Sequence, residues 1–217
     1  LAYLGNLNFN GSDSFTWDGS DGLTFSGVPA TVSLTITAVN DAPVVTSFAA
    51  TVAEDTLLSF AAADFTANFS DVELSTLQSV QIVTLPASGT LALLGVPVTA
   101  GQEIPVAGLG GLTYQGNLNF NGLDSFTWDG SDGLLYSGVP ATVNITVTSV
   151  NDAPTDIRWN GVTPAGNALP AAGAIIANLG TVDPDNVSFT YSLLAGSSPN
   201  FTVSPAGVVR RVNSAMA

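Results

Sequence analysis

The chain contains an internal repeat, and this feature constrains its fold more than any other. Residues 1–43 and 112–154 align without a gap at an offset of 111 positions, and 34 of the 43 aligned residues are identical. A fixed period of this kind indicates a tandem array of similar units. A unit of this length has the size of one β-sandwich domain, which takes roughly 100 residues. We therefore divide the chain into the second half of one repeat (1–43), a complete repeat (44–154) and the first part of a divergent domain (155–217).

Within the repeat, polar and apolar residues alternate with a period of two. Residues 31–37 and 142–148 both show this alternation, which gives a β-strand one buried and one solvated face. Residues 78–85 alternate as well, and residues 90–98 indicate a hairpin around Gly95. No segment has a sustained helical period. Many short strands separated by Gly and Pro predict an all-β Greek-key sandwich.

Aromatic residues are placed symmetrically in the two copies. Phe126 and Trp128 share one face of a predicted strand, and Phe15 and Trp17 share the equivalent face in the first copy. Large aromatic side chains on the apolar face of a strand are typical of a core. We therefore expect both pairs to be buried.

The charge of the chain is strongly one-sided. Seventeen acidic residues stand against three arginines, which gives a net charge of -14. Nucleic acids and anionic membranes would be repelled, so we exclude both as partners. A cation remains attractive to this surface, and most of the acidic residues are Asp, whose short side chain suits turns and calcium loops. Acidity that serves only solubility is the alternative explanation.

The chain contains no His and no Cys. This composition excludes Ser-His-Asp and Cys-His mechanisms, and also histidine-ligated metal sites. A glycosidase-like carboxylate pair such as Asp18 and Asp21 would remain, but it lies on a repeated turn, so we predict that the chain is not an enzyme. Without Cys, a secreted protein needs another source of stability, and metal ions at the junctions between repeats would supply it.

The N-terminus and the hydropathy of the chain bear on its localisation. Leu1 is not an initiator methionine, so we expect any signal peptide to lie upstream. No apolar stretch reaches the roughly 20 residues that a transmembrane helix requires, so we expect no membrane insertion within these residues.

Both copies of the repeat end in the sequence Val-Asn-Asp-Ala-Pro, at residues 39–43 (the first junction) and 150–154 (the second junction). Proline favours an extended conformation in the residue before it, so each linker should be short and straight. Calcium takes six to eight oxygen ligands, more than one Asn-Asp pair offers. Further acidic groups follow the junctions at Glu54-Asp55, at Asp71-Val72-Glu73 and at Asp183-Pro184-Asp185. In the last group we expect an extended chain that projects both carboxylates to one side.

These motifs, in this order, resemble the cadherin-like tandem repeats of large bacterial adhesins. The resemblance rests on Asn-Phe-Asn-Gly-Leu-Asp-Ser-Phe at 119–126, on Ser131-Asp132-Gly133 and on the Asn-Asp-Ala-Pro junctions. The third segment, through Leu-Gly-Thr-Val-Asp-Pro-Asp at 179–185, is similar to a second variety of cadherin domain. The resemblance covers nearly the whole chain. It implies tandem immunoglobulin-like or cadherin-like Greek-key β-sandwiches joined by short linkers.

The resemblance also implies calcium ligands. In that family the junction Asn-Asp, an acidic residue near the start of the module, an Asp-x-Asp pair and a later Asp converge on Ca²⁺. The matching residues around the first junction are Asn40, Asp41, Glu54, Asp71, Glu73 and Asp132, and those around the second are Asn151, Asp152, Asp183 and Asp185. Four further residues could be either ligands or turn residues that bond backbone amides, namely Asp13, Asp18, Asp124 and Asp129.

The function that the resemblance implies is structural. It predicts calcium-binding extender repeats of a large extracellular bacterial adhesin, secreted or at the cell surface, in cell adhesion or biofilm attachment. The expected partners are neighbouring repeats of the same chain, and cell-surface or matrix ligands bound through other domains. The alternative is a carbohydrate- or ligand-binding module that uses aromatic side chains such as Tyr114, Tyr136 and Trp159. An exposed, planar set of these rings would favour that alternative.

Overall fold

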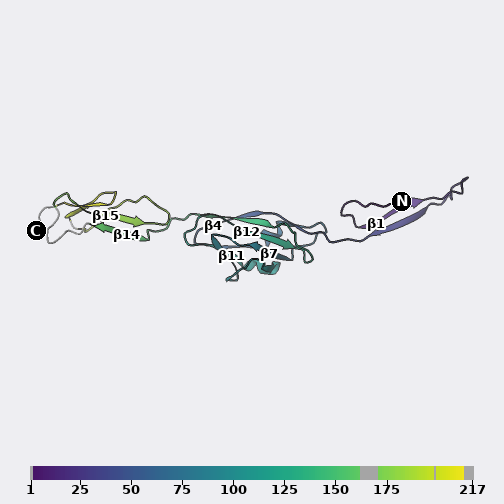
Figure 1. Cartoon of the computed structure of the whole chain (residues 1–217), viewed down its shortest axis with the longest axis horizontal. Coiled ribbons are helices and arrows are strands. Elements are labelled where there is room, and N and C mark those ends of the chain that lie inside the picture. The colour runs from purple at the N-terminus through teal and green to yellow at the C-terminus, as the bar shows by residue number, and fades with distance from the viewer. Residues whose placement is uncertain (1, 162–170, 198, 213–217) are drawn as a thin grey trace. The chain divides into compact units, whose positions relative to one another are not determined.

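The computed structural model describes residues 2–161, 171–197 and 199–212 (Figure 1). Its contacts divide the chain into two compact units. The first unit consists of Leu1–Val52, Thr56–Asn117 and Leu123–Thr146, and the second consists of Ala53–Asp55, Leu118–Gly122 and Val147–Ala217. Two short loops of the complete repeat therefore belong to the same compact unit as the C-terminal segment.

The N-terminal part of the first unit is a β-hairpin. Strands β1 (Gly11–Trp17) and β2 (Ala30–Ile36) pair antiparallel, with Gly11 opposite Ile36 and Trp17 opposite Ala30. The strand predicted for residues 31–37 is thereby confirmed.

The complete repeat is a β-sandwich. One sheet has the strand order β10 (Glu103–Pro105), β7 (Ser79–Thr84), β12 (Gly122–Ser131), β13 (Ala141–Thr148) and β4 (Phe48–Ala53). The other has the order β5 (Leu57–Ser59), β11 (Leu112–Gly116), β8 (Gly89–Leu93) and β9 (Val96–Pro97). Strands β3 (Val44–Val45) and β6 (Phe69–Ser70) form a small third pair. The chain crosses repeatedly between the sheets, and the predicted strands and the hairpin at 90–98 are confirmed.

The core of the sandwich lies between the two main sheets. Phe126 and Trp128 of β12 are fully buried, as predicted, and Tyr114 of β11 is buried as well. The ring of Phe65 meets that of Trp128 edge-on at a centroid distance of 5.1 Å. Edge-to-face contacts between aromatic rings add to the stabilisation that burial itself provides.

Two short helical segments were not expected from the sequence. Helix α1 (Ala62–Thr66) and the 3₁₀ helix η1 (Val106–Gly111) lie in the connections between strands. In α1 the carboxylate of Asp64 accepts the backbone amide of Ala61 at 2.8 Å, and Phe65 is buried. Five residues are too few to establish a 3.6-residue period, so the sequence pattern shows only a loop there.

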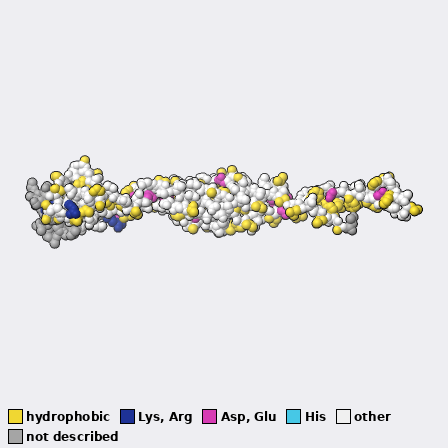
Figure 2. Space-filling model, turned by 90° about the horizontal axis from the view of Figure 1, so that it is seen from above, with side chains coloured by type: hydrophobic (Ala, Val, Ile, Leu, Met, Phe, Trp, Pro, Cys, Tyr) yellow, Lys and Arg dark blue, Asp and Glu magenta, His cyan; other side chains and the backbone are white. Residues whose placement is uncertain are grey.

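The aromatic pair of the N-terminal hairpin is not buried. Phe15 is 39% exposed and Trp17 is 53% exposed, so the prediction of a core position is wrong for the described hairpin. Figure 2 shows hydrophobic side chains on the surface over this N-terminal region. Residues 1–43 align with residues 112–154, but among the described residues none lies over the apolar face of the hairpin as residues 44–111 lie over that of the complete repeat.

The second unit contains one four-stranded antiparallel sheet. Its strand order is β14 (Asp156–Gly161), β15 (Ile175–Val182), β17 (Val208–Arg211) and β16 (Phe201–Val203). Ala177 of β15 and Val209 of β17 are its buried apolar residues. None of the helices in the described residues is long and apolar enough to cross a membrane.

Candidate metal centre

The pairing of two strands brings Glu54 beside the second junction. The backbone amide of Thr142 donates to Ser47 Oγ at 2.9 Å, and the backbone amide of Glu54 donates to the carbonyl of Thr148 at 2.8 Å. Residue numbers rise together from Ser47 to Glu54 and from Thr142 to Thr148. Strands β4 and β13 are therefore parallel, and their C-terminal ends lie at the same end of the sheet. The residues that follow them are therefore neighbours.

Glu54 is a buried carboxylate at this end of the sheet, with only 3% of its surface exposed. Its Oε1 accepts the backbone amide of Val150 at 2.6 Å, and its Oε2 accepts the side-chain amide of Asn121 at 3.3 Å. Burying a carboxylate is costly unless hydrogen bonds and an opposite charge compensate it. The structure gives Glu54 the hydrogen bonds but no basic partner among the described residues.

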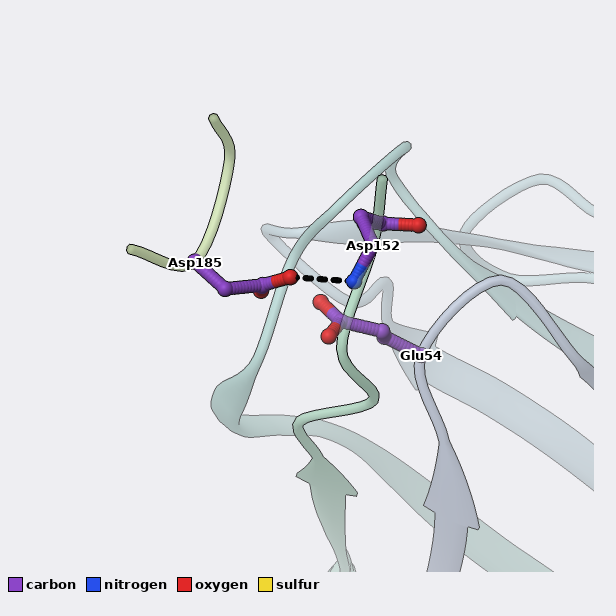
Figure 3. Close-up of side chains that lie close together, drawn as sticks. All are labelled: Glu54, Asp152 and Asp185. Carbon is purple, nitrogen blue, oxygen red and sulfur yellow. Dashed lines mark hydrogen bonds between the residues drawn. The ribbon is translucent and has the colours of Figure 1, made fainter. Parts of the chain in front are cut away.

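The structure therefore corrects the grouping that the family resemblance implied. Glu54 lies with Asp152 and Asp185 of the second junction, and not with the residues of the first. Carboxylate oxygens of these three side chains all lie within 4.8 Å of one another. Figure 3 shows the carboxylates of Glu54 and Asp185 turned toward each other beside the backbone amide of Asp152.

A turn positions Asp185. The chain bends at Pro184 and Asp185, and Asp183 Oδ1 accepts the backbone amides of Asp185 at 3.0 Å and Asn186 at 2.8 Å. The expectation of an extended Asp-Pro-Asp segment is wrong, because an Asp side chain that bonds the amides two and three residues later stabilises a turn. Asp185 Oδ2 in turn accepts the backbone amide of Asp152 at 2.5 Å.

The electrostatics of this cluster are unfavourable without a cation. Burial raises the pKa of Asp152, and the negative charges of Asp185, Asp55, Glu54 and Asp183 raise it further. Burial also raises the pKa of Asp183, but the hydrogen bonds from Asp185 and Asn186 outweigh that effect and leave its pKa lowered. Five carboxylates thus share one region of the second unit.

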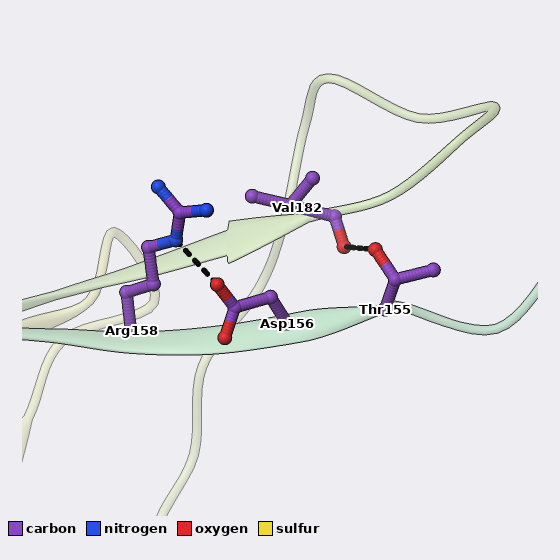
Figure 4. Close-up of polar contacts among 4 residues, drawn as sticks. All are labelled: Thr155, Asp156, Arg158 and Val182. Atoms are coloured by element: carbon purple, nitrogen blue, oxygen red, sulfur yellow. Dashed lines mark hydrogen bonds and ion pairs between the residues drawn. The ribbon is translucent and has the colours of Figure 1, made fainter.

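The nearest arginine in sequence does not relieve this charge. Arg158 Nε forms a salt bridge with Asp156, within β14, and Thr155 Oγ1 donates to the carbonyl of Val182 at 3.3 Å (Figure 4). Arg158 is therefore already engaged with a carboxylate outside the cluster.

The donor set fits a calcium ion. Calcium binds oxygen at about 2.3–2.6 Å, so ligands on opposite sides of one ion stand about 5 Å apart. Three carboxylate oxygens within 4.8 Å of one another meet that requirement. The family resemblance predicted two of these residues at this junction, Asp152 and Asp185, and placed Glu54 elsewhere.

Two residues near the cluster, Asn119 and Asn186, were missed by the sequence reasoning, which named Asp55 only as the acidic neighbour of Glu54. The backbone amide of Asn119 donates to Asp55 Oδ1 at 3.0 Å, and its side-chain amide, turned toward the carboxylates, reaches Asp152 Oδ2 at 3.1 Å. Asn186 Nδ2 donates to Asn151 Oδ1 and to Asp183 Oδ1, both at 3.1 Å. The signal for Asn119 was its position at the start of the family motif at 119–126. Asn186 directly follows the Asp-Pro-Asp motif.

The remaining predicted residues gather at the first junction. Asn40 Nδ2 donates to Asp132 Oδ2 at 2.8 Å, and the backbone amide of Asp41 donates to Glu73 Oε2 at 3.2 Å. Asp71 Oδ1 accepts the backbone amide of Ser75 at 2.9 Å, while its Oδ2 is buried without a hydrogen-bond partner. A buried carboxylate oxygen without a donor is a suitable ligand for a cation. Among the described residues, the three-carboxylate arrangement is found at the second junction and not here.

Of the four residues whose role was left open, Asp18 and Asp129 accept backbone amides within their turns, whereas Asp124 accepts the amides of the distant residues Ala87 and Ser88. Asp18 Oδ1 accepts the amide of Gly19 at 2.8 Å and that of Ser26 at 3.1 Å, and Asp129 Oδ1 makes the equivalent bonds to Gly130 and Ser137. The side-chain hydrogen bond from Ser26 is the main cause that lowers the pKa of Asp18. Backbone amides, with that of Thr24 first, lower the pKa of Asp21. A general acid needs a raised pKa, so the Asp18 and Asp21 pair is poorly suited to glycosidase chemistry.

The aromatic side chains considered for ligand binding do not share one environment. Tyr114 is part of the core, and its hydroxyl donates to the buried Asp124 at 2.9 Å. Tyr136 is half-buried, whereas Trp159 is exposed. A platform built from all three rings is therefore excluded by the burial of Tyr114.

The comparisons with known proteins agree with this architecture. The model of the cadherin-like domain family matches residues 39–148, just over half of the chain. A search of curated proteins found no match. The crystal structure of mouse protocadherin-24 EC1-3 is 17% identical, with a TM-score of 0.54, and the match covers 97% of this chain and 69% of that chain.

Two further structures are similar. Protocadherin gamma B7 extracellular cadherin domains 1–4 are 15% identical, with a TM-score of 0.53, and the match covers 95% of this chain and 50% of that one. Protocadherin gamma B2 extracellular cadherin domains 1–5 are 16% identical, with a TM-score of 0.52, and the match covers 87% of this chain and 36% of that one. This chain thus spans from about a third to two thirds of these relatives, and at such identities the likeness shows the fold alone. The chain belongs to the cadherin-like domain family, and its fold is the cadherin-like β-sandwich.

Proposed function

We propose that the carboxylates at the two junctions bind calcium, and that this binding stiffens the chain as an extender of a large extracellular bacterial adhesin. The observation that carries the proposal is the group formed by Glu54, Asp152 and Asp185, whose carboxylate oxygens lie within 4.8 Å of one another. The family to which the chain belongs is structural and adhesive rather than enzymatic.

The proposed mechanism is electrostatic. Without a cation, five clustered carboxylates repel one another. Burial raises the pKa of Asp152, and the charges of its acidic neighbours raise it further. A calcium ion would remove the repulsion and would hold together three segments that are far apart in sequence, which carry Glu54, Asp152 and Asp185. Asp55 and Asp183 lie close enough to act on Asp152 through their charge and could complete the oxygen shell.

At the first junction, the proposed ligands are Asn40, Asp41, Asp71, Glu73 and Asp132. The buried and unpartnered Oδ2 of Asp71 supports this assignment, as do the hydrogen bonds that already join Asn40 to Asp132 and Asp41 to Glu73. The proposed set at the first junction thus consists of four carboxylates and one side-chain amide.

The free energy available from calcium is moderate for each site. Extracellular modules bind calcium with dissociation constants of about 0.1 mM. At about 1–10 mM free calcium, one such site stabilises the bound state by roughly 1.4 to 2.7 kcal/mol. Several such sites along a repeated chain would together stiffen it substantially. A stiff chain suits an extender that holds an adhesive domain away from the cell in adhesion or biofilm attachment.

Thermal unfolding in EGTA and in calcium tests the proposal. We expect the melting temperature to rise with calcium and to change little with the same concentration of magnesium, which demands a more rigid octahedral shell. The triple variant Glu54→Gln, Asp152→Asn, Asp185→Asn should lose the part of the rise that the second junction contributes. Glu103→Gln, which changes an exposed acid on β10, should keep it. Equal responses to calcium in both variants would contradict the assignment.

A further inference from the structure

The loop before β12 contains an Asn-Gly pair beside the carboxylate cluster. Asn121 lies just outside the strand and Gly122 is its first residue, and both are exposed to solvent. The side-chain amide of Asn121 donates to Oε2 of the buried Glu54 at 3.3 Å. Asn121 is thus an amide at a position where a carboxylate would lie directly beside that of Glu54.

The fold accounts for both residues of this pair. Gly122 has a φ of 135°, a backbone conformation that glycine adopts without strain and other residues do not. Asn121 supplies one of the hydrogen bonds that a buried carboxylate such as Glu54 requires. The loop geometry and the burial of Glu54 therefore place an asparagine directly before a glycine.

An asparagine in this position can react with the backbone that follows it. The reaction is intramolecular, and glycine has no side chain to hinder it. The nitrogen of Gly122 attacks Cγ of Asn121 and forms a five-membered imide. The bond from Cγ to Nδ2 breaks, and ammonia leaves with the proton of the glycine amide. Water then opens the imide at either carbonyl, which gives aspartate or isoaspartate without any change of oxidation state.

A second Asn-Gly pair lies in a different setting. Asn160 and Gly161 belong to β14, where they are opposite Asn178 and Ala177 of β15. A backbone nitrogen within a strand has to leave the sheet by local opening before it can attack a side chain. Asn121 lies outside any strand, so the two pairs should differ in reactivity although their sequences are the same.

The pair at 121–122 also recurs in the first copy of the repeat. Asn10 and Gly11 occupy the equivalent positions, and Gly11 has a similar φ of 119°. Asn10 lines the same cavity as Asp41 and Glu73, two of the proposed ligands at the first junction. In both copies, an asparagine of this kind therefore lies next to a junction.

We propose that Asn121 is a self-modifying residue, whose reaction with Gly122 places a carboxylate beside Glu54 as the chain ages. The modification itself needs only water. Its effect on calcium rests on the proposed function, because the new carboxylate adds an oxygen ligand and a negative charge to the cluster and so tightens calcium binding. Without calcium, the same change takes a donor from the buried Glu54 and sets a like charge beside it, which lowers stability.

Ageing of the full chain tests the chemistry. The protein is incubated at neutral pH and physiological temperature, and peptide mapping by mass spectrometry detects the replacement of NH by O and separates aspartate from isoaspartate. We expect conversion at Asn121 to be at least about tenfold faster than at Asn160. The variant Asn121→Gln, whose longer side chain does not form the five-membered ring, should stay unmodified at this position. Equal rates at Asn121 and Asn160 would overturn the proposal.

Calcium titration tests the consequence, in proteins that all carry Asn10→Gln so that only the second junction changes. The variant Asn121→Asp should bind calcium with a dissociation constant about tenfold lower and should melt at a lower temperature in EGTA. The control Asn160→Asp, which adds the same charge in β14, should change neither value. Aged protein with and without Asn121→Gln repeats the comparison without an introduced acid.

The outcomes of the two tests are separate. Unchanged calcium affinity in both Asn121→Asp and the aged protein would overturn the proposed effect of the modification. Absence of calcium binding in every protein would contradict the proposed function instead, and the rate of conversion at Asn121 would still decide whether the residue modifies itself.

Discussion

Asp185 accepts a hydrogen bond from the backbone amide of Asp152 at 2.5 Å, although the two residues are 33 positions apart in the sequence. This contact joins the turn after β15 to the linker after β13. It places two carboxylates beside the buried Glu54, whose Oε1 accepts the backbone amide of Val150 in the same linker. The loops are thus connected through acidic groups, and their charge makes the arrangement sensitive to cations.

Removing the charge of Glu54 should weaken calcium binding. Glu54→Gln keeps the size of the side chain and an oxygen that can accept the Val150 amide, so the loop should stay in place. We expect the calcium dissociation constant to rise by about tenfold or more, which corresponds to about 1.4 kcal/mol. Isothermal titration of the full chain measures this change, and Glu103→Gln serves as the control. An unchanged dissociation constant would remove Glu54 from the ligand set.

Asp152 should make the metal-free protein less stable at neutral pH. Burial first, and then the neighbouring carboxylates, raise its pKa above that of an unfolded aspartate. The folded state therefore binds the proton more tightly, and stability falls as the pH rises from the unfolded pKa through the folded pKa. In EGTA, Asp152→Asn should be more stable than the original protein at neutral pH, and the difference should shrink as the solution is acidified. Urea unfolding at several pH values checks this, and a variant that is less stable at neutral pH would refute it.

Replacing the equivalent tryptophan by alanine should lower the free energy of unfolding by different amounts in the two copies of the repeat. Trp128 is fully buried against Phe65, so Trp128→Ala should destabilise the complete repeat by about 3–5 kcal/mol. Trp17 is about half exposed in the hairpin, so Trp17→Ala should cost less than about 1 kcal/mol. Chemical unfolding of the two variants in parallel measures both values. Similar costs would mean that the hairpin face is covered in solution.

Two tyrosine hydroxyls offer a second matched pair. Tyr114 donates to Asp124 in the core, and burial raises the pKa of Tyr114 well above its usual value, with a further contribution from Asp124. Tyr114→Phe leaves a buried carboxylate with one donor fewer and should cost about 1–2 kcal/mol. Tyr3 donates to Asp13 at the surface, so Tyr3→Phe should change the unfolding midpoint little. A large effect of Tyr3→Phe would indicate that this part of the hairpin is buried in solution.

The strands of the complete repeat could be predicted from the sequence because they depend on local alternation. Residues 142–148 became β13 with buried Val143, Ile145 and Val147, and Trp128 lies in the core as its neighbours in sequence suggested. Helix α1 was missed because five residues carry no period, and its stability comes from the burial of Phe65 and the cap at Asp64.

The composition of the cluster was harder to predict. Asp152 and Asp185 follow a recognisable motif, but the position of Glu54 depends on the parallel pairing of β4 with β13, which joins residues that are 94 positions apart at Glu54 and Thr148. No local pattern encodes such a long-range pairing. The turn at Asp183 was predicted as an extended segment because alternation in sequence does not reveal that Asp183 Oδ1 bonds the amides that follow it.

The most direct test of the account is a calcium titration of the full chain by isothermal calorimetry, carried out in parallel on the triple variant Glu54→Gln, Asp152→Asn, Asp185→Asn. We predict binding to the original chain with a dissociation constant of about 0.1 mM, and the loss of at least one binding event in the triple variant. A titration that shows no calcium binding to the original chain, or the same binding in the variant, would contradict the assignment of this cluster as a calcium site.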